Sequence, residues 1–299
     1  LHKEMLDHGV DLMVGDKAVS FQGSHMTLAS GRVVEGDAVV MAVGVTPDTA
    51  LARDAGLELN EKGAIVVDPS YRTSDPDIYA VGDAIQVYSA LTDKPMQLAL
   101  AGPAQKQARQ AADSICGRPV RNTGYIGSSC IKVFDYNAAS TGLTAAQCEK
   151  SGIPYDFVYV MPPDRVSLMP GSTPLHYKLI YQVPTGRVLG VQAISKGDAP
   201  KRADIAATLI KFGGTVDDLR DLELCYAPPF STAKDAGNNA ALVACNLLEG
   251  AFRQVKVTEV RGLVESGACI IDVREPGEYA KSHLKTAVNT PLSQLRSRL

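Results

Sequence analysis

The sequence predicts a multidomain chain that combines α/β with α+β structure. Its 299 residues, 45% hydrophobic and 21% charged, are enough for two or more domains with cores of their own. Two apolar runs, at residues 37–44 and 78–81, are closed by glycine, as buried strands of an α/β sheet are. From about residue 122 strand patterns come first and helical patterns follow, which is typical of α+β structure.

The first segment reads as the end of a helix followed by short strands. Residues 1–8 form the helical pattern and Gly9 its C-cap. We expect strands at 10–14, 19–22 and 25–28, then a strand buried on both faces at 37–44, and a turn from Gly44 to Asp48. Because residue 1 is Leu and lies inside this helical pattern, we expect the chain to be the C-terminal part of a longer protein.

The segment from Thr73 to Asp83 is the most informative one. A polar entry leads into a short apolar strand at 78–81, and Gly82 and the Asp83 carboxylate follow at its C-terminal end. Ligands of open α/β sheets bind at that end of the strands. A carboxylate there can accept hydrogen bonds from sugar or ribityl hydroxyls, and the glycine leaves room for them. The alternative is an ordinary strand that ends in an Asp turn.

The next element is an alanine-rich helix. Gly102 and Pro103 predict a turn with proline at the first helical position, and the stretch after them predicts a helix that ends near Gly117. Its N-terminus offers free N–H groups and partial positive charge. A plain amphipathic helix without a ligand is the alternative.

The α+β region contains an extended proline loop. We expect strands at 130–134, 157–160, 175–182 and 188–194, with a hairpin turn at 183–186, and then helices at 199–212 and 216–222. In the segment 224–235, Pro228 and Pro229 exclude an interior helix and favour a rigid extended loop. Rigid loops of this kind position side chains for function.

The last segment begins after residues 250–255. It predicts a short helix at 257–265 and a buried strand that starts at Cys269, with polar landmarks after it. These are Asp272-Val273-Arg274, Glu278-Tyr279, His283 and Asn289-Thr290-Pro291-Leu292. Cys269, at the start of the strand, is expected to be a core thiol.

Composition excludes several classes of function. With 30 basic and 33 acidic residues the net charge is −3, so no nucleic-acid surface is expected. The six cysteines are scattered without a C-x-x-C pair, which argues against a zinc site and a disulfide framework and favours a reducing cytoplasm. No stretch is apolar enough to span a membrane. The expected partners are therefore small molecules or a second copy of the chain.

The order of these motifs resembles the FAD-dependent pyridine nucleotide-disulfide oxidoreductases. The segment from Thr73 to Asp83 is similar to their second flavin-binding motif, whose aspartate holds the ribityl chain of FAD. The resemblance implies FAD and NAD(P)H as cofactors and Thr73, Gly82, Asp83 and Ala101 as cofactor-binding residues. It also implies that the helix beginning near Ala101 points at the flavin pyrimidine ring, where its N-terminus stabilises an anion.

Tyr226-Ala227-Pro228-Pro229 resembles a segment of the coenzyme A disulfide reductases and of related NADH oxidases and polysulfide reductases. In a homodimer the resemblance makes Tyr226 both a catalytic and a cofactor-binding residue, because it brings this tyrosine to the partner's flavin. It assigns Lys234 to a coenzyme A phosphate and Gln105 to a substrate contact. The alternative is a buried interface tyrosine and a solvated lysine.

One departure from the family pattern affects the substrate. Coenzyme A disulfide reductases commonly carry Tyr-Tyr-Pro-Gly where this chain has Leu168-Met169-Pro170-Gly171. One active-site phenol of the family is thus missing. Coenzyme A disulfide, coenzyme A persulfide, polysulfide and oxygen all remain possible substrates.

The landmarks after residue 255 resemble the opening of a rhodanese domain, whose nucleophile loop we expect beyond Leu299. The resemblance thus divides the chain into the end of an NAD(P)-binding domain (1–45), the C-terminal segment of a Rossmann-like FAD-binding domain (46–121), a dimerisation domain (122–252) and the first part of a rhodanese-like domain (255–299).

The implied function is an NAD(P)H:disulfide or persulfide oxidoreductase with an appended sulfurtransferase domain. The G-x-G-x-x-G turns and the redox cysteine of the family are absent from these 299 residues, so we expect the polypeptide alone to be inactive. An NADH oxidase and a non-catalytic dimerising fragment are the alternatives.

Overall fold

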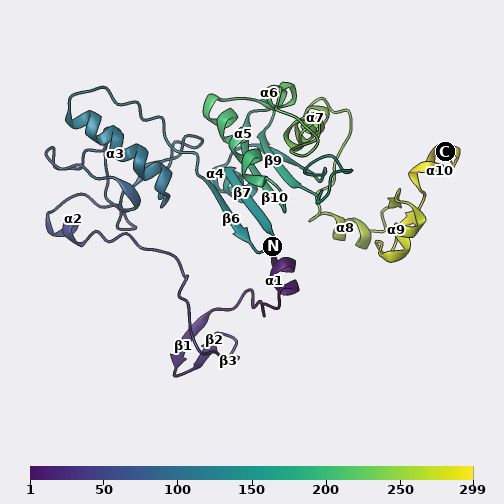
Figure 1. Ribbon diagram of the computed structural model, residues 1–299, viewed down its shortest axis with the longest axis horizontal. Helices are drawn as coiled ribbons and strands as arrows, with labels where there is room; N and C mark the ends of the chain where they lie inside the picture. The colour runs from purple at the N-terminus through teal and green to yellow at the C-terminus, as the bar shows by residue number, and fades with distance from the viewer. Residues whose placement is uncertain (299) are drawn as a thin grey trace. The chain divides into compact units, whose positions relative to one another are not determined.

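The computed structural model describes residues 1–298, with the side chains of residues 1–297, and separates the chain into two compact units (Figure 1). The first unit is Leu1–Leu248 and the second is Glu249–Leu299. The finer division into four segments, at 1–45, 46–121, 122–252 and 255–299, stays a prediction.

The first unit opens with a short helix and a small antiparallel sheet. The helix is α1 (His2–Asp7), and Gly9 follows it with φ 79°, as the predicted helix end requires. The sheet contains β1 (Ala18–Gln22), β2 (His25–Leu28) and β3 (Val33–Glu35) in that order. The strand expected at 10–14 is wrong, because that segment pairs with no other strand of the described chain.

Two further predicted strands are wrong for the same reason. Residues 37–44 are exposed and irregular, and the Val40 side chain is 89% exposed. The run at 78–81 is reduced to a single bridge between Arg72 and Tyr79. An apolar run becomes a buried strand only where neighbouring strands take its hydrogen bonds, and no other described segment flanks these runs as a sheet.

Residues 49–125 form short elements around one long helix. These elements are α2 (Ala50–Asp54), the 3₁₀ turn η1 (Gly82–Ala84), β4 (Val87–Tyr88), β5 (Pro95–Met96) and α3 (Ala101–Ile115). Turn η1 packs against α3. Helix α3 includes Gly102 and Pro103 in its first turn, so the prediction of proline at the first position is wrong by two residues. The helix tolerates this, since N–H groups of the first turn have no partner inside a helix.

A five-stranded antiparallel sheet forms the centre of the first unit. Its spatial order is β6-β7-β10-β9-β8. The strands are β6 (Ser128–Val133), β7 (Tyr136–Gly142), β8 (Tyr155–Val160), β9 (His176–Gln182) and β10 (Val188–Ser195). All four predicted strands and the hairpin turn between β9 and β10 are confirmed, whereas β7 was not predicted.

Helices cover the sheet and form the hydrophobic core together with it. They are α4 (Ala145–Ser151), α5 (Ala199–Phe212), α6 (Val216–Asp221) and α7 (Ala236–Leu248). Helix α5 packs on β7 and β10 (Figure 1). Helix α7 packs on β8 and β9. Both helices present buried alanines to the sheet, so their backbones approach it closely. This packing fixes the N-terminal ends of α5 and α7, where Arg202 and Asp235 lie.

The second unit contains short elements only. They are α8 (Val260–Glu265), β11 (Ile271–Asp272), α9 (Pro276–Lys281), β12 (Val288–Asn289) and α10 (Leu292–Arg298), and β11 pairs with β12 in parallel. The expected buried strand is wrong in its burial, because Ile271 is 51% exposed and the Cys269 thiol is exposed rather than in a core. A pair of two-residue strands has too little sheet to cover both of its faces. Among the described residues, no helix is long and apolar enough to cross a membrane.

Candidate functional site

Turn η1 presents a glycine and a free carboxylate. Gly82 has φ 87°, which favours glycine, and no atom lies within 4 Å of the position that a Cβ would take. The Asp83 side chain is exposed and makes no hydrogen bond or ion pair within the described part of the chain. Both oxygens of this carboxylate are thus free to accept hydrogen bonds from a ligand that approaches over Gly82.

Gln107 connects this turn to α3. Its side chain is fully buried, and its Oε1 accepts a hydrogen bond of 2.6 Å from the Gly82 N–H. Since the Gly82 amide is a donor, the oxygen of the Gln107 amide must face it. The Nε2 group is buried and has no partner among residues 1–297. Sequence reasoning missed Gln107, although a glutamine four residues before Ala111 lies on the buried face of the helix.

The remaining predicted residues of this region lie on the surface or in their own loop. The Thr73 hydroxyl donates to the Asp75 carbonyl at 3.1 Å and accepts from the Asp75 N–H at 3.2 Å, so it closes a local turn. Ala101 is the exposed first residue of α3, and Leu100 before it supplies no side-chain cap. Gln105 is exposed on the same helix.

These observations fit a ligand with hydroxyl groups and an electron-rich ring. Asp83 supplies a free acceptor, Gly82 supplies space, and the uncapped N-terminus of α3 supplies N–H donors and partial positive charge. A flavin dinucleotide has both features, so the residues fit the cofactor that the resemblance implies.

The Tyr226 segment lies beside a cavity of the first unit. The segment 223–234 contains no helix or strand, as the prolines predict. Tyr226 is 49% exposed and lines a cavity of about 530 Å³. The other lining residues are Asp164, Arg165, Asp198, Lys201, Cys225, Ala227, Pro229 and Phe230. Lys234 is exposed and is not among them.

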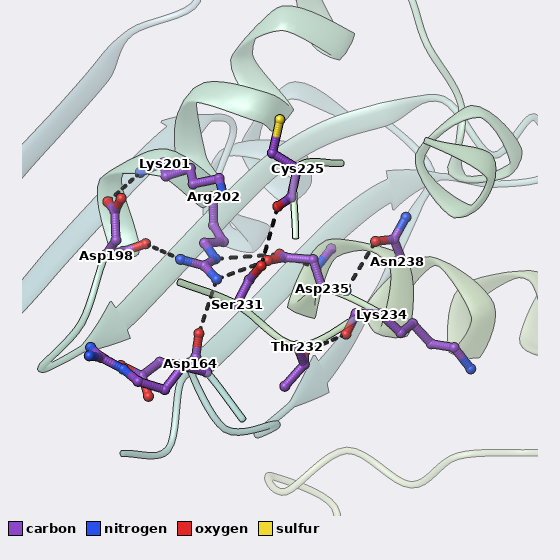
Figure 2. A network of polar contacts seen from close by, with 12 residues as sticks. Asp164, Asp198, Lys201, Arg202, Cys225, Ser231, Thr232, Lys234, Asp235 and Asn238 are labelled. Carbon is purple, nitrogen blue, oxygen red and sulfur yellow. Dashed lines mark hydrogen bonds and ion pairs between the residues drawn. The ribbon is translucent and has the colours of Figure 1, made fainter. Parts of the chain in front are cut away.

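A buried ion pair lies at the end of this segment, as Figure 2 shows. Arg202 of α5 and Asp235, directly before α7, are 2% and 3% exposed. Arg202 Nη2 donates to Asp235 Oδ2 at 2.9 Å, and Nε donates to Oδ1 at 3.4 Å. The Lys234 ammonium points away from this pair (Figure 2). Sequence reasoning missed both residues, since Arg202 and Asp235 are 33 positions apart.

The polar landmarks that follow residue 255 have structural partners in the second unit. Arg274 Nη2 donates to Asp272 Oδ2 at 2.6 Å, and this hydrogen bond lowers the pKa of the Asp272 carboxyl. Asn289 Nδ2 donates to the carbonyls of Asp272 and Arg274 at 3.0 and 2.8 Å. Tyr279 donates to the Ala287 carbonyl at 2.8 Å. These side chains therefore tie β11, α9 and β12 together.

Comparisons with known families agree with this organisation. Residues 1–108 match pyridine nucleotide-disulphide oxidoreductases, and residues 128–236 match the dimerisation domain of the same family. The chain belongs to the pyridine nucleotide-disulphide oxidoreductases. Residues 256–299 of the chain match the rhodanese-like domain. The predicted family and fold class are thus confirmed.

Individual relatives are similar over most of the chain. A coenzyme A disulfide reductase of Staphylococcus epidermidis is 33% identical over 217 residues, which are 72% of this chain and 49% of the relative. The reduced Bacillus anthracis CoADR-RHD structure has a TM-score of 0.96 at 40% identity and covers 99% of this chain and 54% of that one. An NAD-dependent persulfide reductase from A. fulgidus has a TM-score of 0.90 at 32% identity, with 100% and 55% covered. The chain spans about half the length of these relatives.

Proposed function

We propose that this oxidoreductase is an FAD-dependent NAD(P)H:disulfide or persulfide reductase with an appended rhodanese-like sulfurtransferase domain. The observation that carries the proposal is the free Asp83 carboxylate on the Gly82 turn, next to α3. The relatives support it, since their names describe reduction of coenzyme A disulfide and of persulfide.

The residues near η1 would hold the flavin. Asp83 would accept hydrogen bonds from the ribityl hydroxyls, and the N-terminus of α3 at Ala101 would stabilise negative charge on the ring. When bound, FAD would supply two-electron transfer from NAD(P)H to a sulfur substrate. Gln107 would keep the Gly82 turn in its binding geometry, because its Oε1 accepts the hydrogen bond that the Gly82 N–H donates.

Residues of the dimerisation region would act on the sulfur substrate. The Tyr226 phenol is half-exposed on the wall of a cavity, where it can donate a hydrogen bond or a proton to a leaving sulfur. The exposed Lys234 ammonium is a suitable point charge for a coenzyme A phosphate, and Gln105 would contact the substrate. We propose that Tyr226 does this in a homodimer, at the flavin of the partner, and that the enzyme works in the cytoplasm.

An NADH oxidase is the second candidate function. It is favoured by Leu168, which is 92% exposed and stands where coenzyme A disulfide reductases carry a tyrosine. With one phenol fewer near the substrate, oxygen could take the place of a disulfide. The two candidates therefore differ in whether a sulfur compound is reduced.

Measurement of the two half-reactions separately in the complete enzyme tests the proposal. Tyr226→Phe should slow reduction of coenzyme A disulfide or persulfide by about 10²-fold, the usual contribution of a general acid, and leave flavin reduction by NADH unchanged. Tyr159→Phe is the matched control, because Tyr159 is similarly exposed on β8. Equal sulfur half-reactions for the Tyr226 variant and the parent would remove the role of Tyr226. Rapid reoxidation by oxygen alone would favour the oxidase.

A further inference from the structure

The segment 223–234 carries both Tyr226 and Lys234 but has no regular secondary structure. Its shape therefore depends on contacts at its ends and with its neighbours. Inside the segment, the Ser231 hydroxyl donates to the Cys225 carbonyl at 3.3 Å. The Val166 N–H donates to the Pro228 carbonyl at 3.3 Å, which ties the segment to the chain beside the cavity.

The C-terminal end of the segment is fixed by Arg202. The guanidinium group contacts both carboxylate oxygens of Asp235, a planar arrangement that sets direction as well as distance. Its other donors bond the Asp198 carbonyl at 2.9 Å and the Asp164 carbonyl at 3.2 Å (Figure 2). Asp164 and Asp198 both line the cavity next to Tyr226. Arg202 thus connects the Asp235 carboxylate to the start of its own helix and to the backbone at Asp164.

The N-terminal end of the segment is fixed by Asn238 of α7. Its Oδ1 accepts from the Asp235 N–H at 3.1 Å. Its Nδ2 donates to the carbonyls of Leu219 and Leu222 at 3.0 Å each, where α6 ends and the segment is about to begin. Asn238 therefore joins the two ends of the segment directly.

We propose that Arg202, Asp235 and Asn238 are positioning residues. Together they hold the backbone of the segment 223–234, and with it Tyr226 and Lys234, in the geometry that the sulfur half-reaction needs. The inference rests on the proposed function. Replacement of a buried ion pair by apolar side chains is often neutral or stabilising, so stability alone does not explain the pair. What apolar side chains lack is the fixed direction of the guanidinium fork.

Variants of the full-length enzyme can separate positioning from stability. Arg202→Lys keeps the positive charge and loses the fork, and Arg202→Met with Asp235→Leu removes both charges. Leu179→Ala is the control, because Leu179 lies fully buried on β9 in the same core and belongs to neither end of the segment. Each variant is measured by hydrogen exchange of the amides in 223–234 and by the rates of the two half-reactions.

We expect Arg202→Lys to raise exchange in 223–234 about 10-fold more than Leu179→Ala does, because local opening no longer breaks the fork. The sulfur half-reaction should fall about 10- to 100-fold while flavin reduction by NADH is unchanged, since a small displacement of a reacting group has effects of this size. The apolar double variant leaves the Asp198 and Asp164 carbonyls without the Arg202 donors, so it should recover only part of the thermal stability. Its amides in 223–234 should still exchange fast, and its sulfur half-reaction should stay slow.

Three results would overturn this positioning role. The first is an Arg202→Lys variant whose amide exchange in 223–234 and sulfur half-reaction rate equal those of Leu179→Ala. The second is an unchanged sulfur half-reaction rate in a variant whose segment 223–234 exchanges faster. The third is recovery of the sulfur rate together with stability in the double variant. If the parent enzyme reduces no sulfur substrate, the proposed function fails. Hydrogen exchange still tests whether Arg202, Asp235 and Asn238 hold the segment 223–234.

Discussion

Replacement of Gln107 by leucine should leave folding stability almost unchanged and weaken flavin binding. The Gln107 side chain makes one hydrogen bond, to Gly82, and buries one donor without a partner. Loss of the bond costs about 1 kcal/mol, whereas removal of a buried unsatisfied donor returns about 1–3 kcal/mol. The freed Gly82 N–H lies on a half-buried residue, where water can reach it. The free energy of unfolding should therefore stay equal or rise by up to about 2 kcal/mol.

The same change should weaken FAD binding about 10-fold, which corresponds to about 1.4 kcal/mol, because the turn at φ 87° loses the acceptor that holds it. Denaturant unfolding and fluorescence titration of the complete enzyme with FAD measure the two effects. Gln110→Leu is the control on the same helix, since Gln110 accepts from Tyr71 at 2.6 Å and donates to the Arg121 carbonyl at 2.8 Å. That control should lose stability and keep its FAD affinity. A Gln107 variant destabilised by more than about 2 kcal/mol, with unchanged FAD affinity, would refute the reasoning.

The other predictions concern the exposed lysine and the buried thiols. Lys234→Ala should raise KM for coenzyme A substrates by about 5- to 150-fold, as expected for a charge-assisted contact of about 1–3 kcal/mol, and by less at high salt. Small polysulfides are the control substrates, because they carry no phosphate. An equal change in KM for both kinds of substrate would contradict the phosphate role of Lys234. Burial raises the pKa of the Cys148 and Cys245 thiols, so at a given pH they hold less thiolate. Alkylation followed by mass spectrometry should show them reacting more slowly than the exposed Cys130, and only at more alkaline pH; equal rates at neutral pH would contradict this.

The sequence predicted those parts of the fold whose signals are local. Helix α5 has its predicted bounds, because Asp198 caps its start and Gly213 follows its end with φ 73°. The apolar runs at 37–44 and 78–81 carry a strand pattern too, but a strand also needs partners in space, which a pattern does not supply.

The same distinction applies to the candidate site. Tyr226, Lys234 and Asp83 could be proposed as site residues because their motifs are contiguous in the sequence. The residues that hold them are not, since Gln107 acts on a glycine 25 positions away and Arg202 on a carboxylate 33 positions away. Asn238 had a local signal, three residues after Asp235 at the start of a helix, a spacing typical of N-terminal capping.

The buried Arg202–Asp235 pair limits how the cavity beside Tyr226 can admit a molecule. Outward movement of the whole segment 223–234 would carry Asp235 away and leave the Arg202 charge without its partner in a dry interior. Side chains on the rim face no such penalty, and Phe230 is 72% exposed. Entry should therefore proceed by rotation of Phe230 and Tyr226 about their side-chain bonds, in nanoseconds, on a backbone that stays closed. Access to the cavity is therefore controlled by side-chain rotation, and the backbone of the segment 223–234 does not have to move.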